Sequence, residues 1–482
     1  MLEAEAELYA AMAAITAVVF YIMAVVSAVE AILKARTAQG AIAWVISLLT
    51  FPFVTVPLYL IFGRSKFDGY LEQRDAIEAV SQRLLERASD TVEEHILTPS
   101  PDAPVYNSLY KLARIPATRG NKVELLIDGE ATFDSIFAGI ASATQYVMVQ
   151  FYIIRTDDLG RRLVRALADK AREGVRVYLL YDEIGSRSFP RSRLHKQLQM
   201  TGVHVAPFNT TQGRRNRFQL NFRNHRKVVV VDGKQAWIGG HNVGKEYLGQ
   251  KRSVGHWRDT HAKLQGPAVL GAVLAFATDW HWATRAYLDI DLDFAGLKSG
   301  DSTVMVFPSD PASEYEEAGL MYHQIIVAAQ RRIWIASPYF VPDSAIISAL
   351  QLAALRGVDV RLIIPDEPDG PVVAMANWSF TKELLPVGVK IYRYQGGFMH
   401  QKVFLMDDDM AGVGTANFDN RSFRLNFEIT LLVADETFAG DVEQMLEEDM
   451  ERCRLVSEDE IDAKPVWFQL AMGAARLMSP VL

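Results

Sequence analysis

The stretch NHRKVVVVDGKQAWIGGHNVG, residues 224–244, is the part of the chain that decides its fold. It places His225 and Lys227 before a run of four valines, turns at Asp232, and ends a second apolar run with a Gly-Gly-x-Asn corner. A second stretch, MHQKVFLMDDDMAGVGTANFD at residues 399–419, repeats this order of residue types. Because alternate side chains of a strand share a face, the histidine and lysine of each stretch are predicted to point the same way.

The second copy keeps the spacing of the first. His400 and Lys402 are again two residues apart, and Asp407 again follows where the strand gives way to a turn. Each copy ends in an asparagine at a small-residue corner, Asn242 in the first and Asn417 in the second. One such motif is weak evidence, because any strand can carry a histidine and a lysine. Two copies with the same corner indicate a duplicated chemical site.

The surroundings of the two motifs are duplicated as well. Strand-like runs at Tyr146–Ile154 and Val175–Asp182 flank a helical segment, and runs at Arg332–Pro342 and Val358–Asp366 do the same later in the chain. This β-α-β order predicts parallel strands in a sheet that helices cover on both faces.

The offset between the copies is nearly constant. A helix-ending glycine recurs from Gly174 to Gly357, which is 183 residues, and the motif histidine recurs from His225 to His400, which is 175 residues. Glycine just past a helix is the residue that adopts the left-handed conformation required there. A repeat of this length predicts a domain duplication rather than a solenoid.

Composition narrows the class of protein. With 482 residues the chain is long enough for about two or three domains. A net charge of −8 disfavours binding to nucleic acid, which depends on neutralising phosphates. Cys453 is the single cysteine in the sequence, so an internal disulfide and a multi-cysteine metal site are excluded, and an idle thiol is expected.

The N-terminal region, 1–66, is predicted to be a transmembrane hairpin. Leu8–Val29 and Ala41–Phe62 contain no charged residue and are each 22 residues long. As helices they would span roughly 33 Å, enough for a hydrocarbon core of ~30 Å. Pro52 and Pro57 would kink the second helix. Buried core helices are the alternative, whereas a signal peptide is disfavoured because the first apolar run is too long and follows an acidic tail.

Basic residues close to the apolar runs suggest an orientation. Arg64, Lys66 and Arg74 follow the second run, whereas Lys34 and Arg36 lie between the two runs. By the positive-inside rule, this distribution favours a cytoplasmic catalytic region.

The motifs resemble the paired histidine-lysine-aspartate motifs of the phospholipase D superfamily. Together with the apolar hairpin, the segments RNHRK, GGHNVGKEY, SPYFVPD, GTANFDNRSF and NFE make nearly the whole chain similar to bacterial cardiolipin synthases. This resemblance implies an α/β fold in which two phospholipase D-like α-β-α modules are related by a pseudo-twofold axis. We expect a polar helical linker at 67–104, modules at 105–295 and 296–455, and an amphipathic tail at 456–482.

The duplicated fold allows both histidine-lysine pairs to surround one phosphodiester. We expect His225 to attack phosphorus and His400 to act as acid and then base. The two lysines, Lys227 and Lys402, and the two corner asparagines would stabilise charge on the non-bridging oxygens. The resemblance implies neither a metal nor a cofactor.

Each reactive histidine needs a carboxylate to orient its second nitrogen. Two acidic residues lie downstream at places comparable to the family's orienting carboxylates, so we predict that Asp259 pairs with His225 and that Glu428 pairs with His400. Asp232 and Asp407 complete the motif, and their position favours a role as anchors of the strand-to-turn transition.

Several other residues are secondary candidates. Arg421 and Arg424 suit either a headgroup phosphate or salt bridges, and Tyr152 and Tyr339 suit either the pocket or the core. His281 is expected to be a packing residue. The three aspartates beginning at Asp407 are expected to be a solvated turn. In the C-terminal tail, apolar residues at helical spacing over Lys464–Leu482 suit either a membrane interface or docking onto the protein itself.

The resemblance implies a phosphatidyltransferase of the bacterial inner membrane that makes cardiolipin and glycerol from two phosphatidylglycerol molecules. A phospholipase D that releases phosphatidic acid and a lipid-binding scaffold with inactive motifs are the alternatives. An anchored nuclease fits the net charge poorly. The partners expected are phosphatidylglycerol and membrane lipid and not nucleic acid, and homo-oligomer formation stays open.

Overall fold

The computed structural model describes residues 2–35, 37–63, 67, 70, 73–208, 221–251, 255–291 and 298–479. The chain divides into two units. The first consists of Met1–Glu72 with Thr210–Phe222, and the second consists of Gln73–Asn209 with Arg223–Leu482.

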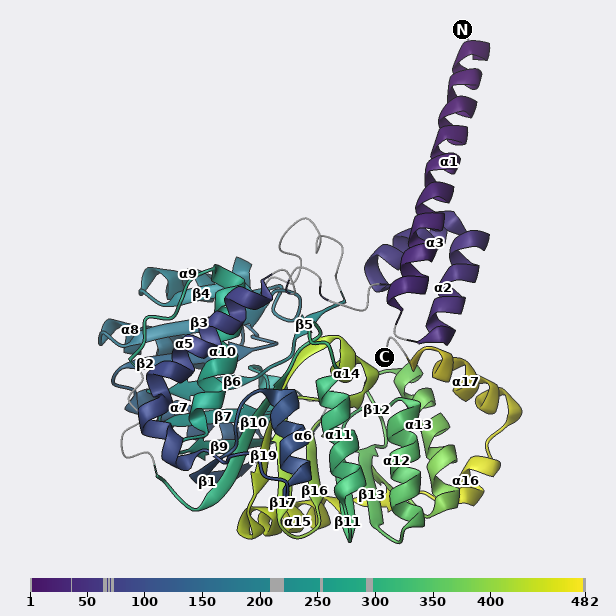
Figure 1. Ribbon diagram of the computed structural model, residues 1–482. Coiled ribbons are helices and arrows are strands. Elements are labelled where there is room, and N and C mark those ends of the chain that lie inside the picture. Colours follow the sequence, from purple (N-terminus) through teal and green to yellow (C-terminus); the bar gives the residue numbers. More distant parts are fainter. Residues whose placement is uncertain are drawn as a thin grey trace. The chain divides into compact units, whose positions relative to one another are not determined.

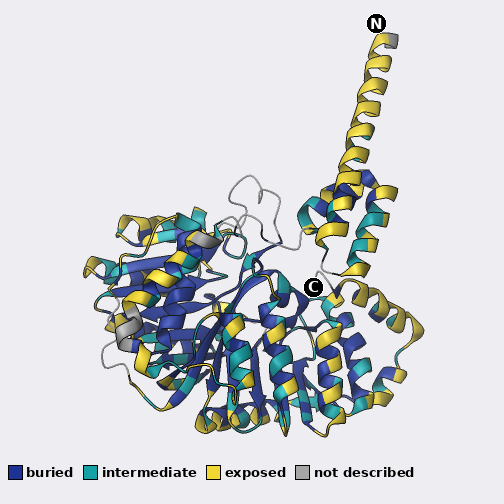
Figure 2. Ribbon diagram, in the orientation of Figure 1, coloured by how far each residue is buried: buried dark blue, intermediate teal, exposed yellow. Residues whose placement is uncertain are grey.

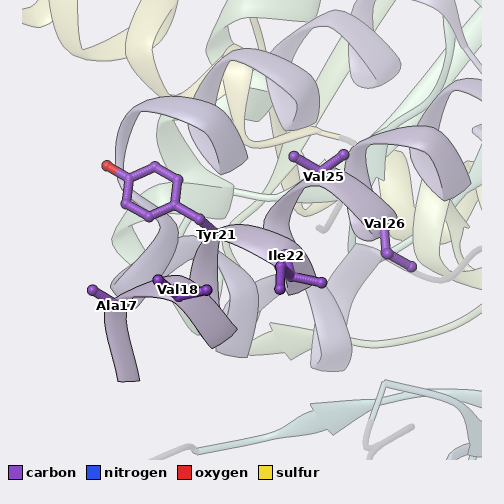
Figure 3. Close-up of a pocket in the computed structure, with 6 residues that line it drawn as sticks. All are labelled: Ala17, Val18, Tyr21, Ile22, Val25 and Val26. Atoms are coloured by element: carbon purple, nitrogen blue, oxygen red, sulfur yellow. The ribbon is translucent and has the colours of Figure 1, made fainter. Parts of the chain in front are cut away.

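The first unit begins with one long apolar helix, α1 (Leu2–Lys34). Of the helices described, α1 is the one long and apolar enough to cross a membrane. Most of its side chains are exposed (Figure 2). Six of them line an apolar pocket on its surface (Figure 3): Ala17, Val18, Tyr21, Ile22, Val25 and Val26. Such a surface suits contact with acyl chains.

The second predicted span, 41–62, is not one continuous helix. Instead α2 (Ala38–Thr50) ends at Phe51, and α3 (Pro52–Leu58) and a π-helical turn (Tyr59–Gly63) follow it. Pro52 has no amide hydrogen with which to continue α2. The backbone at Phe51 leaves the helical region, with φ −131° and ψ 59°. At 13 residues, α2 is ~20 Å long and too short to cross a bilayer alone.

The hairpin is nevertheless present in part, because α2 and α3 pack on the C-terminal half of α1. Small residues such as Ala24 and Ala28 of α1 meet Leu48 and Val56 in this contact. Of the basic residues used for orientation, Arg36, Arg64 and Lys66 lie outside the described residues, as does the side chain of Arg74.

In the second unit, the described residues form a mixed sheet of sixteen strands, of which fifteen lie in one continuous order and the sixteenth, β5 (Arg223–Asn224), pairs with β19 (Asn426–Ala434) beside that order. Its first half has the strand order β1 (Thr118–Ile127), β9 (Thr260–Gln265), β7 (Gln235–Gly239), β6 (Val228–Val231), β2 (Tyr146–Phe151), β3 (Arg176–Asp182) and β4 (His204–Phe208). Its second half has the order β10 (Ser302–Ser309), β19 (Asn426–Ala434), β17 (Met410–Gly414), β16 (Val403–Met406), β11 (Arg332–Ala336), β13 (Asp359–Pro365), β14 (Lys390–Tyr394) and β20 (Cys453–Leu455).

Each strand of the first half has a counterpart at the same place in the second half. The halves join where β1 and β10 pair antiparallel, with Thr118 opposite Val304, which is the relation that a twofold axis produces. The β-α-β units are parallel as predicted, because β2 pairs with β3 and β11 pairs with β13 in parallel. The structure therefore confirms two α/β modules related by a pseudo-twofold axis.

Helices cover both faces of the sheet (Figure 1). In the first half, α7 (Asp128–Ser142) and α8 (Asp158–Arg172) pack on one face, and α10 (Val269–Thr284) packs on the other. Their counterparts are α11 (Glu317–Ala328), α12 (Ser344–Leu355) and α15 (Glu436–Glu451). Gly174 and Gly357 follow α8 and α12 with φ of 89° each, as predicted for helix-ending glycines.

The remaining described helices are short or lie at the edges. They are α5 (Arg74–Val92), α6 (Pro104–Ala113), α9 (Arg193–Met200), α13 (Pro371–Leu384), α14 (Asn420–Arg424), α16 (Glu458–Asp462), α17 (Val466–Leu477) and the 3₁₀ turns Glu93–His95, Phe189–Arg191, Lys245–Leu248 and Leu385–Val387. The segment expected to be a linker contains α5, whose Val80 and Leu84 pack against α10. The expected boundary between modules, 295/296, lies outside the described residues.

The C-terminal helix α17 has two different faces. Phe468, Met472 and Ala475 pack it onto the second module, where Phe468 contacts Trp378 of α13. Trp467 lies on the other face and is 65% exposed. One face of the C-terminal helix therefore docks onto the protein, and its other, apolar face is exposed.

Candidate active site

Two short parallel strand pairs cross between the modules and bring the histidine motifs together. β5 (Arg223–Asn224) pairs with the start of β19, and β15 (Phe398–Met399) pairs with β8 (Trp257–Arg258). In consequence the His225 amide donates to the Phe427 carbonyl at 2.9 Å, and the His400 amide donates to the Arg258 carbonyl at 2.8 Å. Each histidine thus lies beside the residue that precedes a carboxylate of the other module.

The His225 imidazole is held by Glu428. Its Nδ1 lies 2.9 Å from Oε2 and 3.0 Å from Oε1 of that carboxylate. Glu428 also accepts hydrogen bonds from the Thr415 hydroxyl at 2.6 Å and the Asn426 amide at 3.0 Å. Although burial acts in the opposite direction, the charges of His225 and Lys227 hold the pKa of Glu428 below its usual range. The carboxylate is therefore ionised and fixed in place.

The His400 imidazole is held by Asp259 in the same way. Its Nδ1 lies 2.7 Å from Oδ2 of Asp259, whose other oxygen accepts from the Thr260 amide at 2.8 Å. About a tenth of each ring is exposed, 11% for His225 and 10% for His400. In both rings the carboxylate is bound at Nδ1 and not at Nε2.

These pairings correct the sequence-based assignment, which kept each carboxylate with the histidine of its own module. The partners are exchanged: Glu428 holds His225, and Asp259 holds His400. The physical reason is the crossing of β5 and β15 to the opposite module, which places each histidine next to the other module's strand.

The two motif lysines are buried, and each contacts the histidine of its own motif. Burial lowers the pKa of Lys227 to about 7, with Glu428 opposing and Lys402 reinforcing this shift. Burial likewise lowers the pKa of Lys402 to about 8. Burial and the Lys402 ammonium, whose Nζ lies 2.9 Å from Nδ1 of His400, lower the pKa of that imidazole to about 3 against the opposing Asp259 charge.

The electrostatic coupling reaches across the pseudo-twofold axis. Burial lowers the pKa of His225, Glu428 opposes this shift, and the charges of Lys227 and, more weakly, Lys402 reinforce it. The Lys227 charge acts in the same direction on the pKa of His400. The four motif side chains thus share one site.

The sequence had suggested that the motif histidines and lysines lie inside strands. In the structure they precede their strands. β6 starts at Val228 and β16 starts at Val403, directly after the lysines. Each lysine donates from Nζ to the carbonyl of its own motif histidine. This contact turns the side chain back towards the imidazole.

The corner asparagines are both buried beside the site. Asn242 accepts from the Ile153 amide at 3.0 Å and donates to the Tyr247 hydroxyl at 3.3 Å. The Asn417 amide oxygen has no hydrogen-bond partner among the described residues. The two corners are therefore similar in backbone position and different in their hydrogen bonding.

Asp232 and Asp407 lie at the far ends of their strands. From His225 to Asp232 the chain runs seven residues, ~23 Å if extended. The Asp232 carboxylate accepts hydrogen bonds from the amides of Thr144, Gln145 and Tyr146 at 2.8 Å each and from the Thr144 hydroxyl. These contacts are those of a structural anchor and not of a group that touches a phosphate.

Asp407 has the equivalent contacts in the second module. Its carboxylate accepts from the amides of Gln330, Arg331 and Arg332, with 2.7 Å to Arg331. Both aspartates have a positive φ of 51°, a conformation that aspartate tolerates better than most residues. Each aspartate belongs to the sequence motif because a single short strand, β6 or β16, separates it from the motif lysine.

Comparison with known proteins agrees with this geometry. A family model described as the phospholipase D-like domain of cardiolipin synthase matches residues 136–257 and 322–450, and one described as the N-terminal phospholipase D-nuclease region matches 19–64. The chain is 45% identical to cardiolipin synthase A of Pseudomonas fluorescens Pf-5, over 96% of this chain and 97% of that protein. It is 46% identical to cardiolipin synthase A of Pseudomonas aeruginosa LESB58, over 96% of this chain and 94% of that protein.

The chain belongs to the cardiolipin synthase family. Its fold is also that of a solved phosphatidylserine synthase from Haemophilus influenzae, with a TM-score of 0.62 at 17% identity, covering 78% of this chain and all of that one. The family and the apolar helix α1 make this a membrane-associated enzyme.

The secondary candidates named from the sequence fall into two groups: residues that line the site and residues that only support the fold. The Tyr152 ring lies edge-on to the His225 imidazole with 5.2 Å between centres, so it lines the site of this family member. Tyr339 donates its hydroxyl to Asp369 at 2.7 Å. Arg424 pairs with Glu316 at 2.9 Å and with Asp343 at 3.0 Å, which makes it structural.

His281 and Cys453 are also framework residues. The His281 ring packs on Tyr287 with 4.9 Å between centres, as expected for a packing histidine. Burial raises the pKa of the Cys453 thiol to about 12, which keeps it protonated and unreactive.

Sequence reasoning missed the residues that fix the carboxylates. Thr415 and Asn426 both donate to Glu428, and strand alternation places Asn426 on the same face as Glu428, which was a usable signal. The residue between histidine and lysine was missed as well. Arg226 is buried, donates to Asp279 at 2.8 Å and to the Glu428 carbonyl at 3.0 Å, and so ties the two modules together.

Proposed function

We propose that this protein is a membrane-bound phosphatidyltransferase that makes cardiolipin and glycerol from two phosphatidylglycerol molecules. The observation that carries the proposal is the pair of histidines in one site, each oriented through Nδ1 by a carboxylate of the opposite module. Membership in the cardiolipin synthase family supports phospholipid as the substrate.

In the first step, Nε2 of His225 attacks the phosphorus of one phosphatidylglycerol. The bond from phosphorus to the glycerol oxygen breaks, and His400 donates a proton to that oxygen so that glycerol leaves. The product is phosphatidyl-His225. Glu428 assists because it holds the Nδ1 proton of His225 and stabilises the positive charge that develops on the ring.

His400 must carry a proton in the complex although burial and Lys402 make it neutral in the free protein. A bound phosphodiester brings a negative charge that offsets the two ammoniums, and this raises the pKa of His400. Proton uptake on substrate binding is thus part of the proposal.

In the second step, the free glycerol hydroxyl of another phosphatidylglycerol enters. His400, now neutral, removes the hydroxyl proton, the oxygen attacks phosphorus, and the bond between phosphorus and His225 breaks. The two steps together exchange one phosphodiester for another, so no nucleotide is needed. Lys227 and Lys402 stabilise the charge on the non-bridging oxygens in both transition states.

We further propose that the protein lies in the bacterial inner membrane with its second unit in the cytoplasm. The apolar length of α1 and its packing against α2 support a membrane hairpin. Protease added to intact spheroplasts should leave the second unit uncut, and cleavage before lysis would reverse the orientation.

Product analysis tests the function directly. Purified protein incubated with phosphatidylglycerol alone should release glycerol and accumulate cardiolipin in equal amounts. Phosphatidic acid as the main product would instead indicate a phospholipase D, and the absence of turnover would favour a binding protein. With His400→Ala, a phosphatidyl adduct that accumulates on His225 would assign the attack to that residue.

A further inference from the structure

The two motif histidines have different neighbours although the backbone around them is symmetric. Where β15 crosses to β8, Phe398 pairs with Trp257. The equivalent pair, where β5 crosses to β19, is Arg223 with Asn426. In each pair the first residue lies two positions before a motif histidine, and the second lies two positions before the carboxylate that orients this histidine. The backbone symmetry therefore matches Phe398 with Arg223 and Trp257 with Asn426.

A third position differs in the same way. Tyr247 lies five residues after the corner residue Asn242, and Ser422 lies five residues after Asn417, each in the short helical segment that follows its corner. The Tyr247 hydroxyl accepts from the Asn242 side chain at 3.3 Å, whereas the Ser422 hydroxyl accepts from the Asn417 backbone amide at 3.1 Å. Three aromatic residues on one side of the site thus correspond to three polar residues on the other.

The three aromatic side chains form a continuous wall beside His400. Trp257 lies between the other two rings, with 4.7 Å between ring centres to Tyr247 and 4.8 Å to Phe398. The His400 imidazole lies 5.1 Å from the Trp257 ring and 6.0 Å from the Phe398 ring. Tyr247 is buried, whereas Trp257 and Phe398 are partly exposed. This aromatic wall (Tyr247, Trp257 and Phe398) therefore has a buried base and two rings that reach the protein surface beside His400.

The equivalent positions around His225 carry hydrogen-bonding groups instead. The Asn426 side chain donates to Glu428 at 3.0 Å, and the Trp257 indole donates to Asp259 at the longer distance of 3.5 Å. The contact with the orienting carboxylate is thus kept on both sides, whereas the indole ring is added on one side. An addition beside one of two equivalent histidines indicates a task that belongs to that histidine alone.

In the proposed reaction, on which this inference rests, His400 serves the hydroxyl groups that leave and enter. It protonates the departing glycerol oxygen and then removes the proton of the acceptor hydroxyl. Water can replace the acceptor in the second step. Its oxygen then attacks the phosphorus of phosphatidyl-His225, its proton passes to His400, and the bond between phosphorus and His225 breaks to give phosphatidic acid. The acceptor lipid and water therefore compete for the position beside His400.

An aromatic surface discriminates between these two acceptors. The carbon atoms of a glycerol headgroup gain contact with indole and phenyl rings, whereas water beside these rings loses hydrogen-bond partners. Exclusion of water also protects a reactive intermediate from hydrolysis. We propose that the aromatic wall, with Trp257 at its centre, selects the glycerol hydroxyl of the acceptor lipid over water. Its residues determine the specificity for transfer over hydrolysis.

The test measures the ratio of phosphatidic acid to cardiolipin that the full-length protein forms from phosphatidylglycerol. In Trp257→Ala this ratio should rise about tenfold or more, because the largest ring of the aromatic wall is lost. Phe398→Ala should raise the ratio as well. Trp257→Phe keeps a ring but removes the hydrogen bond to Asp259, so its ratio should stay within about threefold of that of the unmodified protein. Both products come from the same active molecules, so partial unfolding of a variant does not alter the ratio.

The matched control is Tyr287→Ala. The Tyr287 ring packs on His281 with 4.9 Å between ring centres, so this change also removes an aromatic neighbour of a histidine, but one outside the two motifs. The product ratio of this variant should equal that of the unmodified protein.

An unchanged ratio in Trp257→Ala and Phe398→Ala would overturn the proposal, because a merely structural role lowers both products together. An equal rise in Trp257→Phe and Trp257→Ala would assign the effect to the hydrogen bond with Asp259 and would overturn it too. If Trp257→Ala forms neither product, the ratio in Phe398→Ala decides by itself. Phosphatidic acid as the main product of the unmodified protein is a separate result and concerns the proposed function.

Discussion

The exchanged pairing of histidines and carboxylates makes a prediction that the sequence-based pairing contradicts. Glu428→Gln removes the charge that orients His225, and Asp259→Asn removes the charge that orients His400. Both substitutions keep the size of the side chain and one hydrogen-bonding oxygen. Each should therefore disable the function of one identified histidine.

The expected magnitude follows from the geometry. Both carboxylates are fully buried and lie within 2.7–3.0 Å of an imidazole nitrogen, so nothing else can take over their charge. Loss of the charge behind a catalytic histidine with intact geometry costs up to ~10⁴-fold in kcat in the serine protease triad. We expect a loss of about 10²–10⁴-fold for each variant with phosphatidylglycerol.

A donor with a better leaving group separates the two roles. In a phosphatidyl ester of p-nitrophenol, the departing oxygen needs no proton, so the first step does not require an acid. Asp259→Asn should then give a burst of p-nitrophenol similar to that of the unmodified protein, whereas Glu428→Gln should stay slow because the nucleophile is impaired. Asp359→Asn, a carboxylate that pairs with Lys390 and Arg361, is the matched control and should behave normally with both donors.

The reasoning would be refuted by the opposite result. If the new donor rescued Glu428→Gln and left Asp259→Asn slow, Glu428 would serve the acid and Asp259 the nucleophile. Thermal unfolding of each variant shows whether a slow enzyme is still folded.

Three further predictions concern single features of the site. In the proposed reaction Lys227 and Lys402 act as ammoniums, and burial lowers their pKa values to about 7 and about 8; kcat/KM should therefore fall as the pH rises through this range, and a flat profile to pH 9 would contradict this role. Asp232→Ala removes four hydrogen bonds far from the reacting atoms, so it should lower the free energy of unfolding by about 1–3 kcal/mol in a denaturant titration and change kcat of the folded enzyme little. In Gly240→Ala the new Cβ would lie 2.0 Å from the carboxylate that orients His400, so activity should fall at least about tenfold, whereas Gly440→Ala meets nothing within 4 Å and should be neutral.

Much of the architecture could be predicted because it depends on local pattern. The strand and helix runs, the helix-ending glycines and the repeated motif determine a duplicated α/β fold, since each relies on residues adjacent in the chain. In the second apolar segment the sequence predicted a kink at Pro52, and the structure breaks the helix there; apolar composition alone did not show that the segment divides into separate short helices.

The sequence by itself determined the chemical groups: one histidine, one lysine and one carboxylate in each of two copies, behind an apolar N-terminus. Only the tertiary structure decided how they combine. Glu428 and His225 are 203 residues apart, and their contact exists because β5 crosses to β19 in the other module. The spacing of residues in the sequence does not show which histidine meets which carboxylate. That pairing depends on hydrogen bonds between strands of different modules, and these form only when the sheet is assembled.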